Sequence, residues 1–385
     1  MASPAFPFDI PALHRPGEFA LRNAQSRRDG DRAITVSELY FAAEPYLGRS
    51  ARAFGYFARP DHLFAPTMPG MLLIHGGGGT AEAGWAAEWA ARGYAALAID
   101  LYGQGPGRQR LPDGGPDWSD DFASFRLDRG IENTWIYHGI ANCLRAISVL
   151  AVLPGVDADR LGVLGVSWGG YFCSSVMCLH ERVKVGIPTY CAGFNPRVAK
   201  ADFILAAAGE ELRNTFDPSN FFDRCRAAVL WTSTATDRGA TLEELVRSHH
   251  AIRDHAPSRL CVHAGPGHTD PRGLGSGEQP TPRLFADAIF RGAPALGLLD
   301  APALDGTRLT LAYRGELPID VAALHWTTDL DKPWTDRTWH ATWADISAPG
   351  VITADLPSAR PLQAFFTTVD ARGALVSSEP VDLGQ

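Results

Sequence analysis

The alternation of short, wholly apolar segments with helical ones is the feature that most limits the fold of this chain. It runs from about residue 34 to 292, and segments such as "GMLLI" and "YAALAI" have no polar face. Strands that are apolar on both faces occur in parallel sheets covered by helices on both sides. We therefore predict an α/β fold with a doubly wound, mostly parallel sheet.

Strand and helix signals follow one another regularly along this region. Two strands, "ITVSELYFAA" and "ARAFGYFARP", are expected to be joined by a turn around Gly48. Helical spacing marks the segments that follow the later strands. The predicted helices are "AEAGWAAEWAARG", "NTWIYHGIANCLRAISVLAVL", "WGGYFCSSVMCLH", "ADFILAAAGEELRN", "TLEELVRSHHAIRDH" and "TPRLFADAIFRG".

The pattern changes after about residue 296, where short alternating strands are separated by turns. This texture predicts a small all-β, sandwich-like domain. It holds four tryptophans, for which we expect core packing and docking onto the main domain; the alternative is a sugar-stacking platform. The predicted division is an N-terminal extension over 1–33, a catalytic domain over 34–295 and the β domain over 296–385. Within the catalytic domain, 103–130 and 192–224 interrupt the alternation and are expected to form a rim or lid.

Composition narrows the function classes. The chain has 35 lysines and arginines against 43 aspartates and glutamates, a net charge of −8, which argues against nucleic-acid and anionic-membrane partners. The N-terminus lacks a signal-peptide pattern, and no apolar run is long enough to span a membrane, so a cytoplasmic setting is expected. The six cysteines show neither C-x-x-C nor zinc spacing and are expected to be small buried side chains.

A candidate nucleophile lies at residues 165–169, Gly-Val-Ser-Trp-Gly, which fit the pattern G-x-S-x-G. Such a short pattern arises by chance, so Ser167 is either a nucleophile or a small turn residue until its context is considered. Here a strand segment, "RLGVLGV", precedes the serine and a helical segment follows it. A tight strand-to-helix turn needs small residues two positions before and after the serine, which Gly165 and Gly169 supply. This context favours a nucleophile.

A serine hydroxyl needs a base, and in this architecture the acid and then the histidine follow the serine, each after a later strand. Asp237 follows "AAVLWTST", and His268 follows "SRLCVHAG" on a Gly/Pro loop. Both are therefore expected at the carboxyl ends of strands, where α/β sheets place their sites.

Other acids and histidines compete for these two roles. His249, His250 and His255 fall on a predicted helix and are expected to be surface groups, whereas His263, inside a strand, is expected to be structural. Asp100 precedes the serine and is expected to brace its loop. The rivals of Asp237 are Asp217, Asp223 and Asp270.

A tetrahedral intermediate carries an oxyanion that needs two preorganised N–H donors. Trp168, directly after the serine, supplies one at a predicted helix N-terminus. The glycine-rich loop "HGGGG", residues 75–79, is expected to supply the other through Gly77 or Gly78. A phosphate-binding loop is the alternative, but no Lys-Ser/Thr follows the glycines and no G-x-G-x-x-G is present.

Together the segments "LLIHGGGG", "GYAALAIDLYGQG", "GVSWGGY" and "PGH" resemble the α/β-hydrolase superfamily. "VDADRLGVLGVSWGGY", with "VKVGIPTY" and "FDPSNFF", is similar to its dienelactone-hydrolase and acetyl-xylan-esterase-like branch. The resemblance covers roughly residues 34–292 and implies a triad of Ser167, Asp237 and His268. Dienelactone hydrolases commonly have a cysteine where this chain has Ser167, so ester hydrolysis is expected rather than lactone opening.

The expected function is a serine carboxylic-ester hydrolase that forms an acyl-enzyme on small acyl esters, acetylated sugars or xylo-oligosaccharides among them. Such a mechanism needs no metal or organic cofactor. The Trp168 side chain is expected to border the acyl pocket and bind substrate. Two rivals remain: a serine peptidase of the prolyl-oligopeptidase type, for whose propeller the N-terminal segment is short, and a catalytically dead hydrolase fold that binds carbohydrate.

Overall fold

The computed structural model describes residues 6–29, 32–61, 66–117, 127–194, 209–265, 267–268, 279–348 and 350–384. By its internal contacts the chain divides into two units. The first unit consists of Met1–Pro188 and Ala192–Ala227, and the second of Thr189–Cys191 and Ala228–Gln385. The predicted rim segments and the helix "ADFILAAAGEELRN" lie partly outside the described residues, which omit 118–126 and 195–208.

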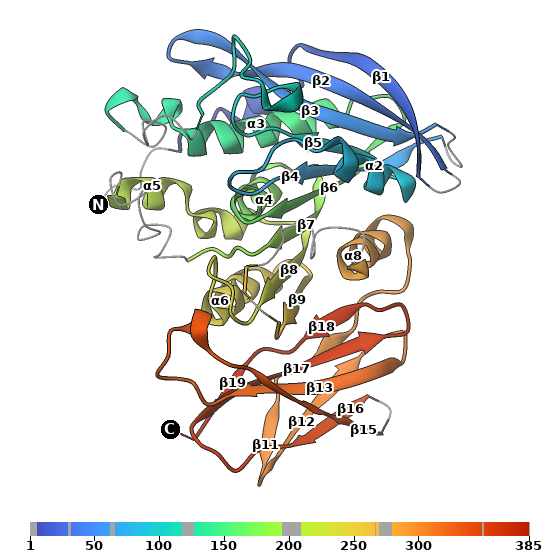
Figure 1. The fold of residues 1–385 in the computed structure, drawn as a ribbon, viewed down its shortest axis with the longest axis vertical. Helices are drawn as coiled ribbons and strands as arrows, with labels where there is room; N and C mark the ends of the chain where they lie inside the picture. The colour runs from blue at the N-terminus through green and yellow to red at the C-terminus, as the bar shows by residue number, and fades with distance from the viewer. Residues whose placement is uncertain are drawn as a thin grey trace. The chain divides into compact units, whose positions relative to one another are not determined.

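The sheet of the first unit has the strand order β1-β2-β3-β5-β4-β6-β7 over the described residues (Figure 1). Strands β1, β2, β3 and β5 pair antiparallel in that order, whereas β5, β4 and β6 run parallel. The expected turn at Gly48 is confirmed, because it joins β2 to β3 with a φ of 73°. The bounds are β1 Phe19–Asp29, β2 Arg32–Tyr46, β3 Arg49–Pro60, β4 Met68–Ile74, β5 Ala95–Ile99, β6 Val156–Val166 and β7 Val183–Thr189.

Helices cover this sheet because its central strands are apolar throughout. Every residue of β4 and β5 is buried, which requires cover on both faces. Helix α3 is itself buried along nearly its whole length, and the Thr134 hydroxyl caps it by accepting from the Tyr137 N–H. The helices of this unit are α1 Ile10–Leu13, α2 Ala83–Ala91, α3 Trp135–Leu150, α4 Trp168–Leu179 and α5 Gly209–Phe216.

The second unit begins with a parallel pair of strands, β8 Ala228–Thr234 and β9 Ser258–His263. Helix α6, Leu242–Arg253, connects them, and a capping box between Thr241 and Glu244 fixes its start. Helix α8, Pro280–Arg291, follows and ends at Gly292 in the left-handed conformation. These elements match the sequence prediction for the same residues.

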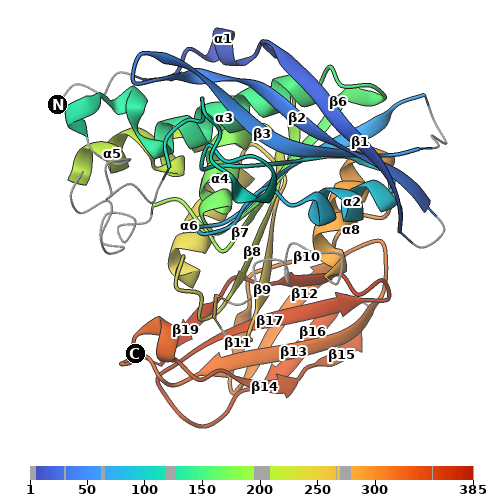
Figure 2. The same cartoon turned by 45° about the horizontal axis from the view of Figure 1, so that its top comes forward.

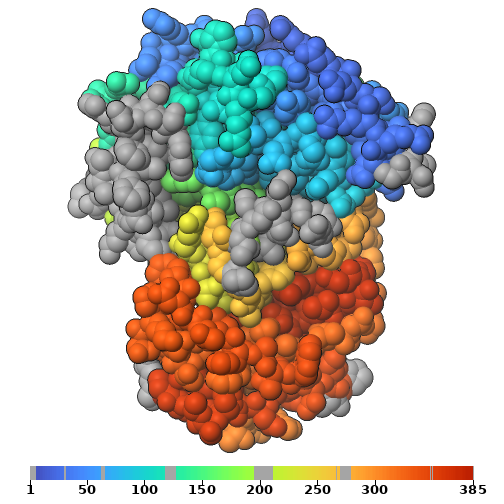
Figure 3. Space-filling view, in the orientation of Figure 1, coloured from blue at the N-terminus to red at the C-terminus, as the bar shows by residue number. Residues whose placement is uncertain are grey.

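Two antiparallel sheets complete the second unit (Figure 2). One has the order β10-β12-β16-β15 with β11 beside β12, and the other β14-β13-β17-β18 with β19 beside β17. Alternate residues of both sheets share one apolar core: Leu309, Leu311, Ala322, Leu324, Ile352, Ala354, Leu362, Ala364 and Phe366. In the space-filling view these C-terminal strands form one continuous orange-to-red body (Figure 3).

The main strands of the first sheet are β10 Leu298–Leu299, β11 Ala303–Asp305, β12 Arg308–Arg314, β15 Asp345–Ala348 and β16 Val351–Asp355. Those of the second are β13 Ile319–Thr327, β14 His340–Trp343, β17 Leu362–Asp370, β18 Leu375–Ser377 and β19 Val381–Leu383. The expectation that all four tryptophans are packed away is wrong for Trp343, which is 79% exposed. In strand β14 its side chain alternates away from the shared apolar core.

Candidate active site

Ser167 occupies a strained turn between β6 and α4. Its φ and ψ are 58° and −118°, a combination that L residues rarely adopt. Close backbone approaches hold the turn: a Cβ on Gly165 would lie 1.9 Å from the Gly169 carbonyl oxygen, and one on Gly169 would lie 2.1 Å from the Ile74 oxygen. Both glycines are therefore required by space. The serine is presented at the carboxyl end of β6 and at the start of a helix, as the sequence predicts.

The HGGGG loop follows β4 and lies against Ser167. A Cβ on Gly76 would lie 3.0 Å from the Ser167 Cβ and 3.7 Å from its Oγ, so a side chain at this position would crowd the serine. The two segments that the sequence paired on motif grounds are thus neighbours in space. This contact places backbone amides of the loop beside the serine, where an oxyanion hole needs them.

The amides of this loop are not equally available. The Gly78 N–H donates to the Tyr102 hydroxyl at 2.8 Å, and the Gly79 N–H donates to the Gly76 carbonyl at 3.0 Å. Gly77 is exposed, and its N–H donates no hydrogen bond to the residues that the structure describes. Of the two glycines predicted as oxyanion donors, Gly77 is the one that this geometry favours.

His75 and Asp100 are buried residues that stabilise the HGGGG loop and the segment after β5. The Leu101 N–H donates to His75 Nε2 at 3.1 Å, so the ring proton is on Nδ1, which donates to the Gly76 carbonyl at 2.8 Å. Burial lowers the pKa of His75 to about 4. Its 3.9 Å approach to Asp100 is therefore a contact of a neutral ring and not an ion pair.

Asp100 braces its own loop, which confirms the role expected for it. Its Oδ2 accepts from the N–H groups of Tyr102 at 2.8 Å and Gln104 at 2.7 Å. Burial is the largest effect on its ionisation and raises its pKa to about 6, while these two bonds oppose that shift. Tyr102 was missed by sequence reasoning, because a tyrosine two positions after a strand carries no catalytic pattern.

Asp237 and His268 come together in the second unit. Asp237 is fully buried after β8, and its Oδ1 lies 2.6 Å from His268 Nδ1. The same carboxylate accepts from the Ser233 hydroxyl at 3.1 Å and from the Gly239 N–H at 3.1 Å. The carboxylate makes Nδ1 the protonated ring nitrogen and leaves Nε2 as the basic one. Ser167 belongs to the first unit and this acid–base pair to the second.

A residue of the 3₁₀ helix Trp334–Asp336, between β13 and β14, supports the loop that carries Asp237. The Trp334 indole N–H donates to the Asp237 carbonyl oxygen at 2.6 Å across 97 residues of sequence. On the other side, the Tyr190 ring packs on the His268 ring at a centroid distance of 4.7 Å. Neither role was predicted, and no local pattern around Trp334 distinguishes it from its neighbours. Docking onto the main part of the chain, expected for these tryptophans, is confirmed for Trp334.

The rival residues have other roles. His249 was expected on the surface, which is wrong: it is 8% exposed, because it faces β9 and its Nδ1 lies 2.8 Å from the Ser258 hydroxyl. Asp217 starts the 3₁₀ helix Pro218–Arg224 and accepts from Ser219, so its carboxylate is used for capping. Asp223 is exposed, and Asp270 lies outside the described residues.

Trp168 begins α4, where the helix dipole favours negative charge. Its half-buried ring packs edge to face on Trp135 at a centroid distance of 5.2 Å and on Tyr171 at 5.5 Å. The Trp135 indole N–H is held by the Leu101 carbonyl at 2.7 Å. An aromatic cluster thus fixes the side chain that follows the serine.

All six cysteines are buried and free, which confirms their expected role as small core residues. Within the described part of the chain, no group of three histidine, cysteine, aspartate or glutamate side chains is arranged to hold a metal ion. No helix there is long and apolar enough to cross a membrane.

Comparison with known proteins agrees with this geometry. Residues 22–204 match the family model described as acetyl xylan esterase (AXE1), a range that includes the HGGGG loop and the elbow but ends before Asp237 and His268. An acetyl xylan esterase from Paenibacillus sp. R4 is 20% identical, with 73% of this chain and 92% of that chain covered and a TM-score of 0.54.

Acetyl xylan esterase 1 from Thermoanaerobacterium sp. JW/SL YS485 is also 20% identical, with 70% of this chain and 91% of that chain covered and a TM-score of 0.54. None of the curated protein sequences matches this chain. At this identity the two structures establish the fold, which is that of an α/β-hydrolase. Over residues 22–204 the chain is similar to the acetyl xylan esterase family, and this similarity supports an esterase.

Proposed function

We propose that this esterase is a serine hydrolase that forms an acyl-enzyme on small acyl esters, with acetylated sugars or xylo-oligosaccharides as its substrate class. The main support for a serine mechanism is the strained conformation of Ser167, with a φ of 58°. The turn that holds this conformation requires the glycines on either side of it. Strain of this kind is maintained where it serves a site. The family match over residues 22–204 supports the substrate class.

In the proposed reaction His268 acts through Nε2, because its Nδ1 is bonded to the buried Asp237 carboxylate. His268 takes the Ser167 proton as the hydroxyl oxygen attacks the ester carbonyl carbon. The N–H groups of Trp168 and Gly77 stabilise the oxyanion of the tetrahedral intermediate. His268 then gives its proton to the leaving alcohol, and the acyl group stays on Ser167.

Deacylation repeats the same steps with water. His268 removes a proton from the water as it attacks the acyl carbonyl, and then returns a proton to the Ser167 oxygen. Asp237 keeps the imidazole in one tautomer and stabilises the imidazolium that forms twice in each cycle. The aromatic cluster that fixes Trp168 supports its proposed place beside the acyl group, where the ring would restrict acyl length.

The decisive experiment is the variant Ser167→Ala, assayed with p-nitrophenyl acetate and acetylated xylo-oligosaccharides. We expect kcat to fall by about 10⁴-fold or more while the fold is unchanged. Ser175→Ala is the matched control, because its hydroxyl lies on the same helix and is bonded to the Tyr171 carbonyl at 3.4 Å. Turnover near the wild-type level by Ser167→Ala would refute the assignment.

Two further measurements separate the rival functions. A fluorophosphonate probe should label wild type and not Ser167→Ala, whereas a dead hydrolase fold would remain unlabelled in both. Aminoacyl amides of the same aryl leaving group should be cleaved far more slowly than aryl esters. Preference for the amides would favour the peptidase reading instead.

A further inference from the structure

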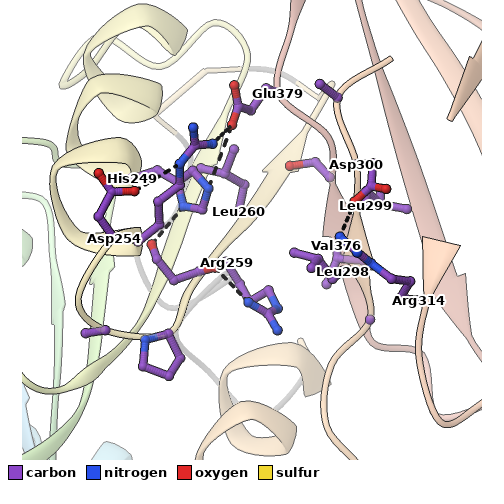
Figure 4. A pocket seen from close by; sticks show the side chains of 17 residues that line it. His249, Asp254, Arg259, Leu260, Leu298, Leu299, Asp300, Arg314, Val376 and Glu379 are labelled. Carbon is purple, nitrogen blue, oxygen red and sulfur yellow. Dashed lines mark hydrogen bonds and ion pairs between the residues drawn. The ribbon is translucent and has the colours of Figure 1, made fainter. Parts of the chain in front are cut away.

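A cavity lies in the second unit, and the proposed acid–base pair does not line it. It has a volume of about 510 Å³ and is bounded by α6, β9, β10, the end of β12 and the residues after β18 (Figure 4). Neither Asp237 nor His268 is among its lining residues. Its size is typical of pockets that take metabolite-sized ligands.

Two of the three carboxylates that line this cavity are paired with arginines. Glu379 accepts from Arg253 at 2.6 Å and from His250 at 2.7 Å. Asp300 pairs with Arg314 across the two strands of that edge (Figure 4). Asp254 is 86% exposed at the rim and lies 3.9 Å from Arg253. None of the three lies within ion-pair distance of Arg259.

Arg259 also lines this cavity, and it differs from Arg253 and Arg314 in its charge partners. It is half-buried near the start of β9, and its Nη1 donates to the Ser258 carbonyl at 2.9 Å. Among the described residues it forms no ion pair with a carboxylate. Burial, and then the positive charge of Arg314, lower the pKa of its guanidinium. A partly buried cation without a counter-ion is costly to the fold and favours an anion beside it.

Apolar side chains form part of the lining. Leu260, Leu298, Leu299 and Val376 face the same space as the arginine (Figure 4). A guanidinium has five N–H donors, and Arg259 uses one of them on the backbone, so an edge remains for two oxygens of an oxyanion. A bare inorganic ion would leave the apolar wall exposed to water, whereas an organic anion would cover it.

We propose that this cavity binds a small organic anion, a carboxylate or phosphate ester, through a bidentate hydrogen bond to Arg259. The leucines cover the carbon skeleton of the ligand. The site is independent of ester hydrolysis, so its test reads binding and not turnover.

The test is isothermal titration calorimetry of the full chain with glucuronate, glucose 6-phosphate, inorganic phosphate and glucose. The first two present a carboxylate and a phosphate on one sugar skeleton, and glucose presents that skeleton without charge. At least one organic anion should bind wild type, and Arg259→Gln should weaken it about tenfold or more. Comparison of the two organic anions then identifies which oxyanion the site prefers.

The matched control is Arg308→Gln, because Arg308 lies on β12 and pairs with Asp355 outside the cavity. It should leave the affinity unchanged. Arg259→Lys keeps the positive charge but loses the paired N–H donors of the guanidinium, so it should weaken binding less than Arg259→Gln. If Arg259→Gln fails to fold, Arg259→Lys provides the test. The proposal is overturned if neither organic anion binds, if both Arg259 variants bind like wild type, or if inorganic phosphate binds as tightly as glucose 6-phosphate.

Discussion

The region around Ser167 and the region around Asp237 are held in place by different means. At Ser167 the constraint is backbone space: a Cβ on Gly165 or on Gly169 would meet a backbone oxygen at 1.9 or 2.1 Å. At Asp237 the constraint is a set of hydrogen bonds from side chains, one of which comes from Trp334, between β13 and β14. Both regions join segments that are distant in the sequence, the first through backbone contacts and the second through side chains.

The two regions should therefore tolerate different kinds of substitution. Backbone contacts at 2 Å admit no added atom, so the elbow should respond to the smallest substitutions with lost stability. Hydrogen bonds to an acid loop adjust the position of a charge, so their loss should affect catalysis more than folding.

Among the substitutions that test this contrast, the largest effect is expected from Asp237→Asn. The amide keeps the shape of the buried carboxylate but removes its charge and permits the wrong imidazole tautomer at His268. We expect kcat to fall by about 10³- to 10⁴-fold with little change in thermal stability, measured with p-nitrophenyl acetate and by calorimetry. Asp223→Asn, at the exposed rival acid, should behave like wild type. Equal activity of the two variants would remove Asp237 from the mechanism.

Gly165→Ala tests the opposite side of the contrast. The added Cβ would meet the Gly169 carbonyl oxygen at 1.9 Å, so the turn must open. We expect the free energy of unfolding to fall by about 3 kcal/mol, measured by urea denaturation. Gly84→Ala in α2 is the control: nothing lies within 4 Å of its added Cβ, and helix propensity should raise stability by about 0.5 kcal/mol. A Gly165→Ala protein as stable as wild type would contradict the packing argument.

His75 and Asp100 under the HGGGG loop give a pH-dependent test. The folded-state pKa of His75 is lowered from 6.5 to about 4, so its contribution to stability is full above pH 6.5 and is lost as the pH falls. The folded-state pKa of Asp100 is raised from 3.8 to about 6, so its contribution is full below pH 3.8 and is lost as the pH rises. Between pH 6 and pH 4 the two effects oppose each other.

Asp100→Asn removes one of these two opposing effects and retains a side-chain oxygen that can accept from Tyr102 and Gln104. On acidification from pH 6 to pH 4, the variant should lose about 2 kcal/mol more unfolding free energy than wild type. Urea denaturation at each pH measures this. Asp305→Asn, at an exposed position, is the control and should follow wild type. If the unfolding free energies of wild type and Asp100→Asn depended on pH in the same way, the raised pKa assigned to Asp100 would be contradicted.

The smallest effect is expected from Trp334→Phe, which keeps the ring and removes the donor to the Asp237 carbonyl. Loss of one hydrogen bond behind the acid should lower kcat about three- to tenfold, with KM unchanged and the pH–rate profile displaced. Trp343→Phe, at the 79% exposed tryptophan, should change none of these. If Trp334→Phe lowered the melting temperature alone, the tryptophan would be structural and not a positioning residue.

Much of the fold could be predicted because its signals are local. The apolar strands, the Gly48 turn, the major helices and the β-rich C-terminal part each follow from periodicity over about ten residues. The burial of His249 could not be predicted, since a histidine on an amphipathic helix reads alike on either face until its packing partner is known. The prediction that Trp343 is buried was wrong for a related reason, because the alternation of residues in a strand does not say which face of the strand meets the core.

For the site, the sequence by itself determined the residue types that a strained elbow and a glycine loop require, because steric limits on the backbone act within a few residues. It also ordered Ser167, Asp237 and His268 along the chain. Only the tertiary structure decided that Gly78 gives its N–H to Tyr102, that Trp334 supports the acid loop, and that Arg259 faces a cavity without a counter-charge. These features depend on contacts between residues that are distant in the sequence, and the spacing of residues along the chain does not specify such contacts.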